Sequence, residues 1–268
     1  MAVGNLNVDL SGRVALVTGS TSGMGEEMAR QLARSGATVV SHGLGPREHI
    51  EALRAELDKA SGTPAMHLPH DLTAPERGAE MVREVEARFG RLDILINNAG
   101  IQHVSPIEDF PDERWNALLA VNLSAAFHAT KAAFRGMKQR KFGRMIATSS
   151  TLGVTAEMNK AAYVSSKHGV IGLVRSAALE GAEHGITANA ICPGWVLTPL
   201  AAGQVEAKVK ASGLPREVVI REQFLNQQPT RRFVSTGEIA GTILFLCSDA
   251  AASITGVAIP VDGGQLVL

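Results

Sequence analysis

One glycine-rich turn near the start of the chain restricts the possible folds more than any other feature. The segment Thr18–Gly25 reads TGSTSGMG and follows the short apolar run Arg13–Val17, which is typical of a buried strand. It precedes Glu26–Arg34, whose apolar residues recur with the period of a helix. Glycines at such a junction allow the backbone to turn tightly and to approach a pyrophosphate at the helix N-terminus. Because an ordinary strand-to-helix turn can also contain glycines, the interpretation depends on the rest of the chain.

Strand-like and helix-like runs continue to alternate after this turn. Further strands are predicted at Thr38–Ser41, Ala65–Leu68, Ile94–Ile96, Arg144–Thr148, Thr187–Ile191 and Val257–Val261. Helix-length segments, such as Arg47–Lys59 and Glu76–Phe89, separate most of them. Hydrophobic residues make up 45% of the chain and aromatic residues only 4%, and small aliphatic side chains of this kind fill parallel sheets that are covered by helices. The pattern predicts an α/β fold with a doubly wound parallel sheet of the Rossmann type.

The chain is expected to form a single domain over residues 1–268. Its sequence contains no fixed-period repeat, low-complexity stretch or Pro/Ser-rich linker that would mark a boundary. One segment, residues 194–228, departs from the alternation and is predicted to be an insertion within the domain. Because ligands of doubly wound sheets bind at the carboxyl ends of the strands, this insertion is predicted to cover the substrate.

Charge and cysteine content exclude several classes of partner. Lys+Arg and Asp+Glu both number 26, so no net field would attract nucleic acid or an anionic membrane, and a small-molecule partner is expected. Cys192 and Cys247 lie in no CxxC or Cys/His pattern, which argues against a disulfide framework and against a metal site. Residues 1–12 lack the pattern of a signal peptide, and no run of about 18 apolar residues follows. These features predict a cytoplasmic protein.

Two further motifs indicate a chemical function. Asn97–Gly100 reads NNAG directly after an apolar strand, where small residues would let the backbone pass close to a nucleotide, although a plain turn is the alternative. Tyr163 is the only tyrosine of the chain, and Lys167 follows it by four residues, so on a helix both side chains project from one face. A free phenol titrates at about pH 10, and a neighbouring ammonium stabilises the phenolate. Such a pair is suited to transferring a proton to or from a reacting hydroxyl.

The three motifs, in this order, resemble the short-chain dehydrogenase/reductase family over essentially the whole chain. The resemblance implies an NAD(P)-dependent oxidoreductase that moves a hydride between nicotinamide and a secondary alcohol or ketone. It also implies four catalytic residues, Asn122, Ser150, Tyr163 and Lys167. Ser150 would hydrogen-bond the substrate oxygen, and its neighbours Ser149 and Thr151 are the alternative assignments.

The resemblance further assigns residues that bind the cofactor. They are Gly19, Thr21, Ser22, Gly23, Met24, Gly25, Asp71, Leu72, Asn98, Ala99, Gly100, Tyr163, Lys167, Pro193, Gly194, Val196 and Thr198. Asp71 is expected to contact adenine, and Thr198 is expected to hold the nicotinamide carboxamide. Residues 41–45 read SHGLG and lack the acid that NAD-specific members often place after the second strand. NAD is the expected cofactor and NADP stays open, because Arg47 can either meet a 2′-phosphate or be an exposed residue at a helix start.

A narrower resemblance, to bacterial D-3-hydroxybutyrate dehydrogenases, is carried by Asn97–Gln102, Asn159–Tyr163 and Ile191–Trp195. It implies a short 3-hydroxy acid as substrate, with (R)-3-hydroxybutyrate and acetoacetate as the expected pair. The implied substrate-binding residues are Gln102, Ser150, Leu152, Lys160, Tyr163, Trp195 and Gln204. Leu152 departs from the subgroup, which usually has a histidine there, and its apolar side chain removes one contact to the substrate carboxylate.

Each member of this substrate clamp has a structural alternative. Lys160 can be an exposed loop charge, Gln102 and Gln204 can be ordinary surface amides, and Trp195 can anchor the inserted segment.

Other functions and the assembly state also follow from the family. One alternative is a short-chain reductase for another ketone, such as a 3-oxoacyl thioester or a sugar. A nonenzymatic nucleotide sensor is the second alternative, although such a protein need not keep all four catalytic residues. The family implies a homotetramer, and the helix of Tyr163 is rich in small residues that permit close packing: Ser165, Ser166, Gly169, Gly172 and Ala177.

Overall fold

A computed structural model describes residues 7–268, in which seven strands form one sheet. The strands are β1 (Val14–Val17), β2 (Thr38–His42), β3 (Met66–Leu68), β4 (Ile94–Asn97), β5 (Gly143–Thr148), β6 (Ile186–Pro193) and β7 (Ala258–Val261). They lie in the order β3-β2-β1-β4-β5-β6-β7, and all neighbours are parallel. The strands from β1 to β3 extend the sheet in one direction, and those from β4 to β7 extend it in the other. The change of direction lies between β1 and β4, and doubly wound sheets bind ligands at such a point. The predicted doubly wound parallel sheet is confirmed, with every predicted strand within two residues of its observed bounds.

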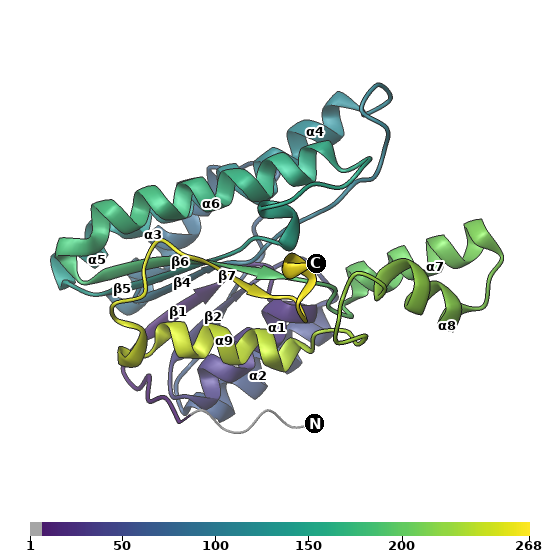
Figure 1. Cartoon of the computed structure of the whole chain (residues 1–268). Coiled ribbons are helices and arrows are strands. Elements are labelled where there is room, and N and C mark those ends of the chain that lie inside the picture. The colour runs from purple at the N-terminus through teal and green to yellow at the C-terminus, as the bar shows by residue number, and fades with distance from the viewer. Residues whose placement is uncertain (1–6) are drawn as a thin grey trace.

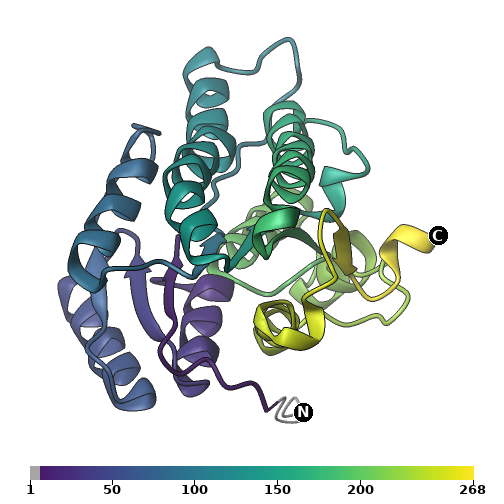
Figure 2. The ribbon, with the colours of Figure 1, turned by 90° about the vertical axis from the view of Figure 1, so that its left-hand side faces the viewer.

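Helices cover both faces of this sheet, as Figures 1 and 2 show. One face carries α1 (Gly23–Arg34), α2 (Arg47–Ser61) and α9 (Thr236–Cys247). The other face carries α3 (Arg77–Phe89), α4 (Asp112–Leu119), α5 (Ala125–Arg140) and α6 (Ala161–Gly181). Short 3₁₀ turns lie at Thr151–Gly153, Ala182–His184, Asp249–Ala251 and Gln265–Val267.

The strands alternate their side chains between two hydrophobic cores. Leu16 and Leu95 pack with α3, α5 and α6, whereas Ala15 and Ile94 pack with α1 and α9. All four are fully buried. Because both faces of the sheet are covered, each strand reads as a continuous apolar run rather than as an alternation of polar and apolar residues.

One long helix in the described part of the chain is apolar enough to span a membrane by length and composition. It runs from Asp112 to Arg140, has a mean hydropathy of 1.2 in its most apolar window and is 44% buried there. A π-helical turn at Ala120–Ser124 joins α4 to α5 within it. Since α5 packs against α3 and the sheet through Ala125, Ala129 and Ala133, this is a core helix of the domain. The signal-peptide expectation for residues 1–12 falls partly on residues 1–6, which lie outside the described residues.

A small helical layer projects beyond the carboxyl ends of the strands (Figure 1). It contains α7 (Pro199–Ser212), α8 (Arg216–Val219) and a π-helical turn at Ile220–Phe224, all within residues 194–228. The Thr198 hydroxyl caps α7 by accepting from the Ala201 N–H at 3.3 Å. The layer has a core of its own, made by Val205, Val219, Phe224 and Leu225. It lies at the end of the sheet where the glycine-rich turn also lies.

Candidate active site

A cleft at the carboxyl ends of β1, β2 and β4 brings together most of the residues expected to bind a cofactor. The residues of this cofactor cleft include Gly19, Thr21, Ser22, Gly23, Met24, Gly25, Asp71, Leu72, Asn98, Ala99, Gly100 and Thr198. They come from four separate segments of the chain, which the sheet topology places side by side. The carboxyl group of Asp71 is exposed, and the Thr73 N–H bonds it at 2.9 Å, which lowers its pKa.

The glycine-rich turn packs closely on its neighbours and leaves free donors at the start of α1. A side chain on Gly25 would collide with the Gly19 carbonyl and the Asn98 amide, so the turn can pack against β4 only with glycine there. Gly19 and Gly23 have φ of 64° and 59°, a conformation that glycine adopts without strain. Ser22 makes no side-chain cap, and within residues 7–268 the N–H groups of Gly23 and Gly25 have no acceptor. A phosphate at this helix terminus would accept these hydrogen bonds.

His42 supports the turn rather than facing a ligand. Its Nδ1 accepts from the Gly19 N–H at 3.1 Å, and its Nε2 donates to the His70 carbonyl at 2.9 Å. Burial lowers the pKa of His42 to about 4, so the imidazole is neutral near pH 7 and keeps the proton on Nε2. His42 belongs to residues 41–45, the segment in which NAD-specific members often carry an acid. Both nitrogens of its ring are hydrogen-bonded to the protein backbone.

Asn98 also holds the turn in place. Its amide donates to the carbonyls of Thr18 at 3.0 Å and Gly19 at 3.1 Å, while the Thr18 hydroxyl accepts from the N–H groups of Asn98 and Ala99. The side-chain amide of Asn98 is therefore occupied by hydrogen bonds within the protein. Asn98, Ala99 and Gly100 of the NNAG motif line the cleft.

Tyr163 and Lys167 lie on α6 and face the end of β5. The Lys167 ammonium donates to the Thr148 carbonyl at 2.7 Å and lies 5.5 Å from the centre of the Tyr163 ring. Burial raises the pKa of Tyr163 to about 12, and interaction with the Ser150 hydroxyl opposes this shift. The same burial lowers the pKa of Lys167 to about 8. Desolvation thus disfavours the charged form of both groups. An ammonium beside a phenolate favours the charged form of each.

Asn122 lies in the π-helical turn between α4 and α5. Its Oδ1 accepts from the Ile101 N–H at 2.8 Å, and its Nδ2 donates to the Ile101 carbonyl at 3.0 Å and the Ser166 hydroxyl at 3.1 Å. A Cβ built on Gly100 would lie 3.5 Å from Asn122 Oδ1 and 3.6 Å from Lys167 Nζ, so these groups meet across one backbone segment. π-Helical turns often occur at functional sites because they redirect side chains and carbonyls.

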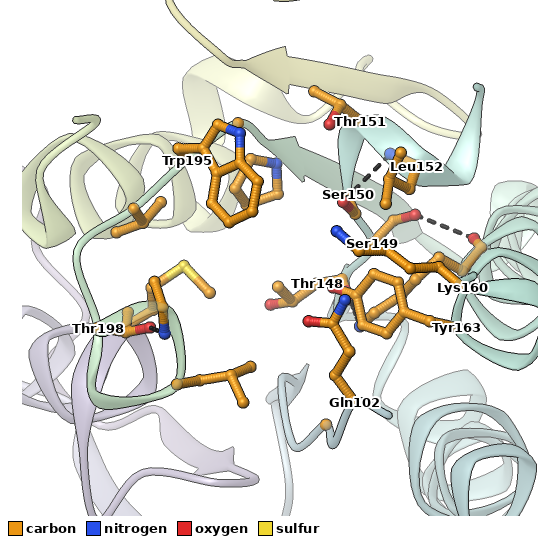
Figure 3. Close-up of a pocket in the computed structure, with 18 of the residues that line it drawn as sticks. Gln102, Thr148, Ser149, Ser150, Thr151, Leu152, Lys160, Tyr163, Trp195 and Thr198 are labelled. Atoms are coloured by element: carbon orange, nitrogen blue, oxygen red, sulfur yellow. Dashed lines mark hydrogen bonds between the residues drawn. The ribbon is translucent and has the colours of Figure 1, made fainter. Parts of the chain in front are cut away.

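A second cavity, here called the substrate pocket, opens next to the side chains that were expected to be catalytic (Figure 3). All seven expected substrate residues line it: Gln102, Ser150, Leu152, Lys160, Tyr163, Trp195 and Gln204. Lys167, Pro193, Gly194 and Val196, which were expected at the cofactor, line the same pocket. Met24, Asn98, Gly100, Thr198 and Leu200 line both cavities, so the cofactor cleft and the substrate pocket are continuous.

The structure decides between several alternatives for the clamp. Lys160 is only 5% exposed, so it is not a solvated loop charge, and its ammonium lies 5.2 Å from the centre of the Trp195 ring. The Gln204 amide donates to Gln102 Oε1 at 3.0 Å, which pairs the two amides inside the pocket. Trp195 lines the pocket and also contacts the projecting layer. Its ring packs edge-to-face on Phe224, with 4.6 Å between the ring centres.

Five residues that line the pocket were not predicted from the sequence: Thr148, Glu157, Leu200, Ala201 and Gln265. Glu157 lies at the wall of the pocket, and its carboxylate pairs with the Lys160 ammonium at 2.9 Å. The two residues lie in the loop before α6, where the three-residue spacing of opposite charges carries no helical signal. Gln265, near the C-terminus, also lines the pocket, and no local motif indicates it.

Other chemistry is not apparent in the described part of the chain. Residues 7–268 contain no group of three or more His, Cys, Asp or Glu side chains that could hold a metal ion. Cys192 and Cys247 are buried free thiols. Burial raises the pKa of both thiols, so both stay protonated near pH 7.

Comparison with protein families decides the wider assignment. A family model described as enoyl-(acyl carrier protein) reductase matches residues 19–265, which include the NNAG motif, Tyr163, Lys167 and the glycine-rich turn from Gly19 onward. The chain belongs to the short-chain dehydrogenase/reductase family. It is therefore an oxidoreductase that uses NAD or NADP, as the sequence resemblance implied.

Individual members of the short-chain dehydrogenase/reductase family match nearly the full chain. D-beta-hydroxybutyrate dehydrogenase of Cupriavidus necator is 46% identical, over 95% of this chain and 98% of the relative. The protein of the same name from Rhizobium meliloti is 44% identical, over 94% and 98%. A 3-oxoacyl-[acyl-carrier-protein] reductase of Staphylococcus aureus is 36% identical, over 94% and 97%.

Solved structures show the same fold. An actinorhodin polyketide ketoreductase with NADPH has a TM-score of 0.87 and 35% identity, covering 94% of this chain and 97% of that one. Levodione reductase has a TM-score of 0.87 and 29% identity, covering 96% and 98%.

The residues of the cofactor cleft fit a dinucleotide of this kind. Within residues 7–268 the α1 terminus offers N–H groups without an acceptor, and its glycines let the turn pack closely on the neighbouring backbone. When bound, the nicotinamide accepts or returns the hydride. Ser150, Tyr163 and Lys167 line the adjoining pocket, with the Lys167 ammonium beside the Tyr163 ring.

Proposed function

We propose that the chain interconverts (R)-3-hydroxybutyrate and acetoacetate, with NAD as cofactor. The observation that carries the proposal is a buried cation, Lys160, in the same pocket as Ser150 and Tyr163. A short hydroxy acid can place its carboxylate at Lys160, Gln102 and Gln204 while its hydroxyl reaches Ser150 and Tyr163. The 44–46% identity to two hydroxybutyrate dehydrogenases supports the same substrate class.

The catalytic and binding roles are part of this proposal. Tyr163 takes the hydroxyl proton in oxidation and returns it in reduction, Ser150 orients the reacting oxygen, and Lys167 stabilises the phenolate. Asn122 fixes the backbone next to Lys167. The proposed cofactor residues are the expected ones in the cofactor cleft, together with Tyr163, Lys167, Pro193, Gly194 and Val196. Residues 1–268 act as one domain, in which the segment 194–228 covers the substrate.

Lys160→Ala is expected to test the substrate class directly. A hydrogen bond to a charged group is worth about 1.5–3 kcal/mol, so the substitution should lower kcat/KM for 3-hydroxybutyrate roughly tenfold to a hundredfold. The neutral methyl ester should be much less affected, because it carries no charge for Lys160 to bind. Initial rates with the acid and with the methyl ester give the ratio of the two losses in kcat/KM. Lys208→Ala, at an exposed position of α7, is the matched control.

Equal losses on the acid and the ester would contradict the carboxylate clamp. The assignment as a dehydrogenase would survive that result, since it depends on the catalytic residues and the family.

NAD is expected to give a kcat/KM at least about tenfold above that with NADP. Within residues 7–268 no lysine or arginine lines the cofactor cleft, so nothing cationic is placed to meet a 2′-phosphate. Arg47 begins α2 on the exposed surface. Arg47→Ala should leave the NAD/NADP ratio unchanged. A higher efficiency with NADP than with NAD would refute the preference.

A reductase for a 3-oxoacyl thioester is the second candidate. It is supported by the 36% identity to an acyl-carrier-protein reductase and by Leu152, which makes one wall of the pocket apolar. An initial-rate panel of short 3-hydroxy acids and 3-oxoacyl thioesters separates the two substrate classes. A protein that only senses nucleotides would turn over neither.

We further propose a cytoplasmic homotetramer. Exposed apolar side chains on the outer helices, such as Phe127 on α5 and Leu179 on α6, offer surfaces for subunit packing. Sedimentation velocity at the assay concentration is expected to give the mass of four chains, and a monomer there would contradict the proposal.

A further inference from the structure

We propose that Gln265 is a substrate-binding residue whose amide hydrogen-bonds the acid end of the substrate and helps to set substrate preference. The inference rests on the proposed function and adds a residue that neither the motifs nor the family resemblance indicated. It follows from the position of Gln265, from the state of its amide and from the needs of a carboxylate in this pocket.

A rigid turn after β7 places Gln265 at the pocket. The Asp262 carboxylate accepts from the N–H groups of Gly264 and Leu266, both at 2.9 Å, and so ties the turn on either side of Gln265. Gly263 and Gly264 adopt φ of 62° and 89°, which permits the sharp change of direction. Figure 1 shows the C-terminal turn beside the carboxyl ends of the strands, and Gln265 lines the substrate pocket.

The amide of Gln265 has no partner among residues 7–268. Its Oε1 is shielded from solvent and accepts no hydrogen bond, and no hydrogen bond of its nitrogen is present either. Gln102 and Gln204, in contrast, bond each other across the same pocket. The enclosed atom is an acceptor, and a carboxylate has no proton to donate to it. Rotation of the terminal torsion exchanges the amide oxygen and nitrogen and places the NH2 group in the enclosed position, where it gains an acceptor when a carboxylate binds. The terminal torsion of glutamine is soft, and here it can rotate without breaking a hydrogen bond.

A carboxylate in this pocket can accept hydrogen bonds from several walls at once. A carboxylate offers about four lone-pair positions to donors. Lys160 already shares its ammonium with Glu157, and one amide proton of Gln204 is bound to Gln102. Leu152 supplies no donor from the loop after β5. Within residues 7–268 two pocket amides keep uncommitted NH2 groups, those of Gln102 and Gln265, and Gln265 approaches from the C-terminal turn.

Two substitutions at Gln265 test the inference. Gln265→Leu keeps the approximate volume but removes the amide, and it should raise KM for 3-hydroxybutyrate about tenfold with kcat nearly unchanged. Gln265→Glu places a carboxylate beside that of the substrate and should raise KM further. The methyl ester should respond weakly to Gln265→Glu. Gln223→Leu, at an exposed position of the projecting layer, is the matched control, and Tm checks the folding of each variant.

A double substitution makes the test sharper. Leu152→His introduces a donor on another wall of the pocket, so it should lower KM more in the Gln265→Leu background than in the wild type. Unchanged KM values in both Gln265 variants, or equal changes for acid and ester, would overturn the inference while leaving the proposed function intact. A wild-type enzyme without activity on 3-hydroxy acids would overturn both.

Discussion

Tyr163→Phe is expected to lower kcat by about 10²–10⁴-fold, the range that general acid–base catalysis supplies, while Tm and NAD affinity stay close to wild type. The substitution removes only the phenolic oxygen, and the ring that packs beside Lys167 remains. Steady-state kinetics of purified variant, together with a thermal melt and a cofactor titration, measure the three quantities.

The environment of Tyr163 gives this loss a defined pH dependence. Burial holds the pKa of Tyr163 near 12, and Lys167 is the cation that offsets this burial by favouring the phenolate. Oxidation needs the phenolate and reduction needs the phenol. The oxidative rate of the wild type should therefore rise with pH until the Tyr163–Lys167 pair has titrated, whereas the reductive rate should fall. The residual activity of Tyr163→Phe should lack this dependence.

Neighbouring hydroxyls provide the controls. Ser150→Ala should also reduce kcat strongly, because the Ser150 hydroxyl interacts with that of Tyr163. Ser149→Ala should be milder, since the Ser149 hydroxyl already donates to the Lys167 carbonyl at 2.9 Å. Substantial turnover by purified Tyr163→Phe would remove tyrosine from the proton-transfer role, whatever the serine variants show.

The fold was accessible from the sequence because its signals are local. Each strand is an apolar run buried on both faces, and each crossover helix has an apolar stripe, so period alone separates them. The same logic places Tyr163 and Lys167 on one helical face. The π-helical turn at Ala120–Ser124 carries no comparable signal, since it depends on packing against the rest of the chain.

The missing parts of the site depend on tertiary structure. Gln265 reaches the pocket through the Asp262 turn, far along the chain from Tyr163. His42 bonds the backbone of Gly19 only because β2 lies beside β1 in register. Lys160 looks like a loop residue in the sequence, and it is buried because the segment 194–228 folds back over it through Trp195.

Lys167→Met is expected to lower kcat/KM about a hundredfold or more and to weaken cofactor binding, while Tm changes by only a few degrees. Methionine keeps the length and apolar stem of the side chain but removes the charge that favours the Tyr163 phenolate. The small change in stability follows from two opposing effects. Loss of the hydrogen bond to the Thr148 carbonyl costs about 1–3 kcal/mol, and relief from burying an ammonium returns about 3 kcal/mol at pH 7.

The pH dependence distinguishes a catalytic Lys167 from a structural one. Its pKa is about 8 in the folded protein and 10.5 in the reference state, so between these values the unfolded chain binds more protons and wild-type stability rises with pH. Lys167→Met lacks this gain, so its stability relative to wild type should be greatest below pH 8 and should decline towards pH 10.5. The oxidative rate of the variant should recover partly at high pH, as hydroxide forms the phenolate that the ammonium no longer favours. Denaturant unfolding and kcat measured from pH 6 to about 10 test both trends. A large fall in Tm with no recovery of rate would assign Lys167 a structural role instead.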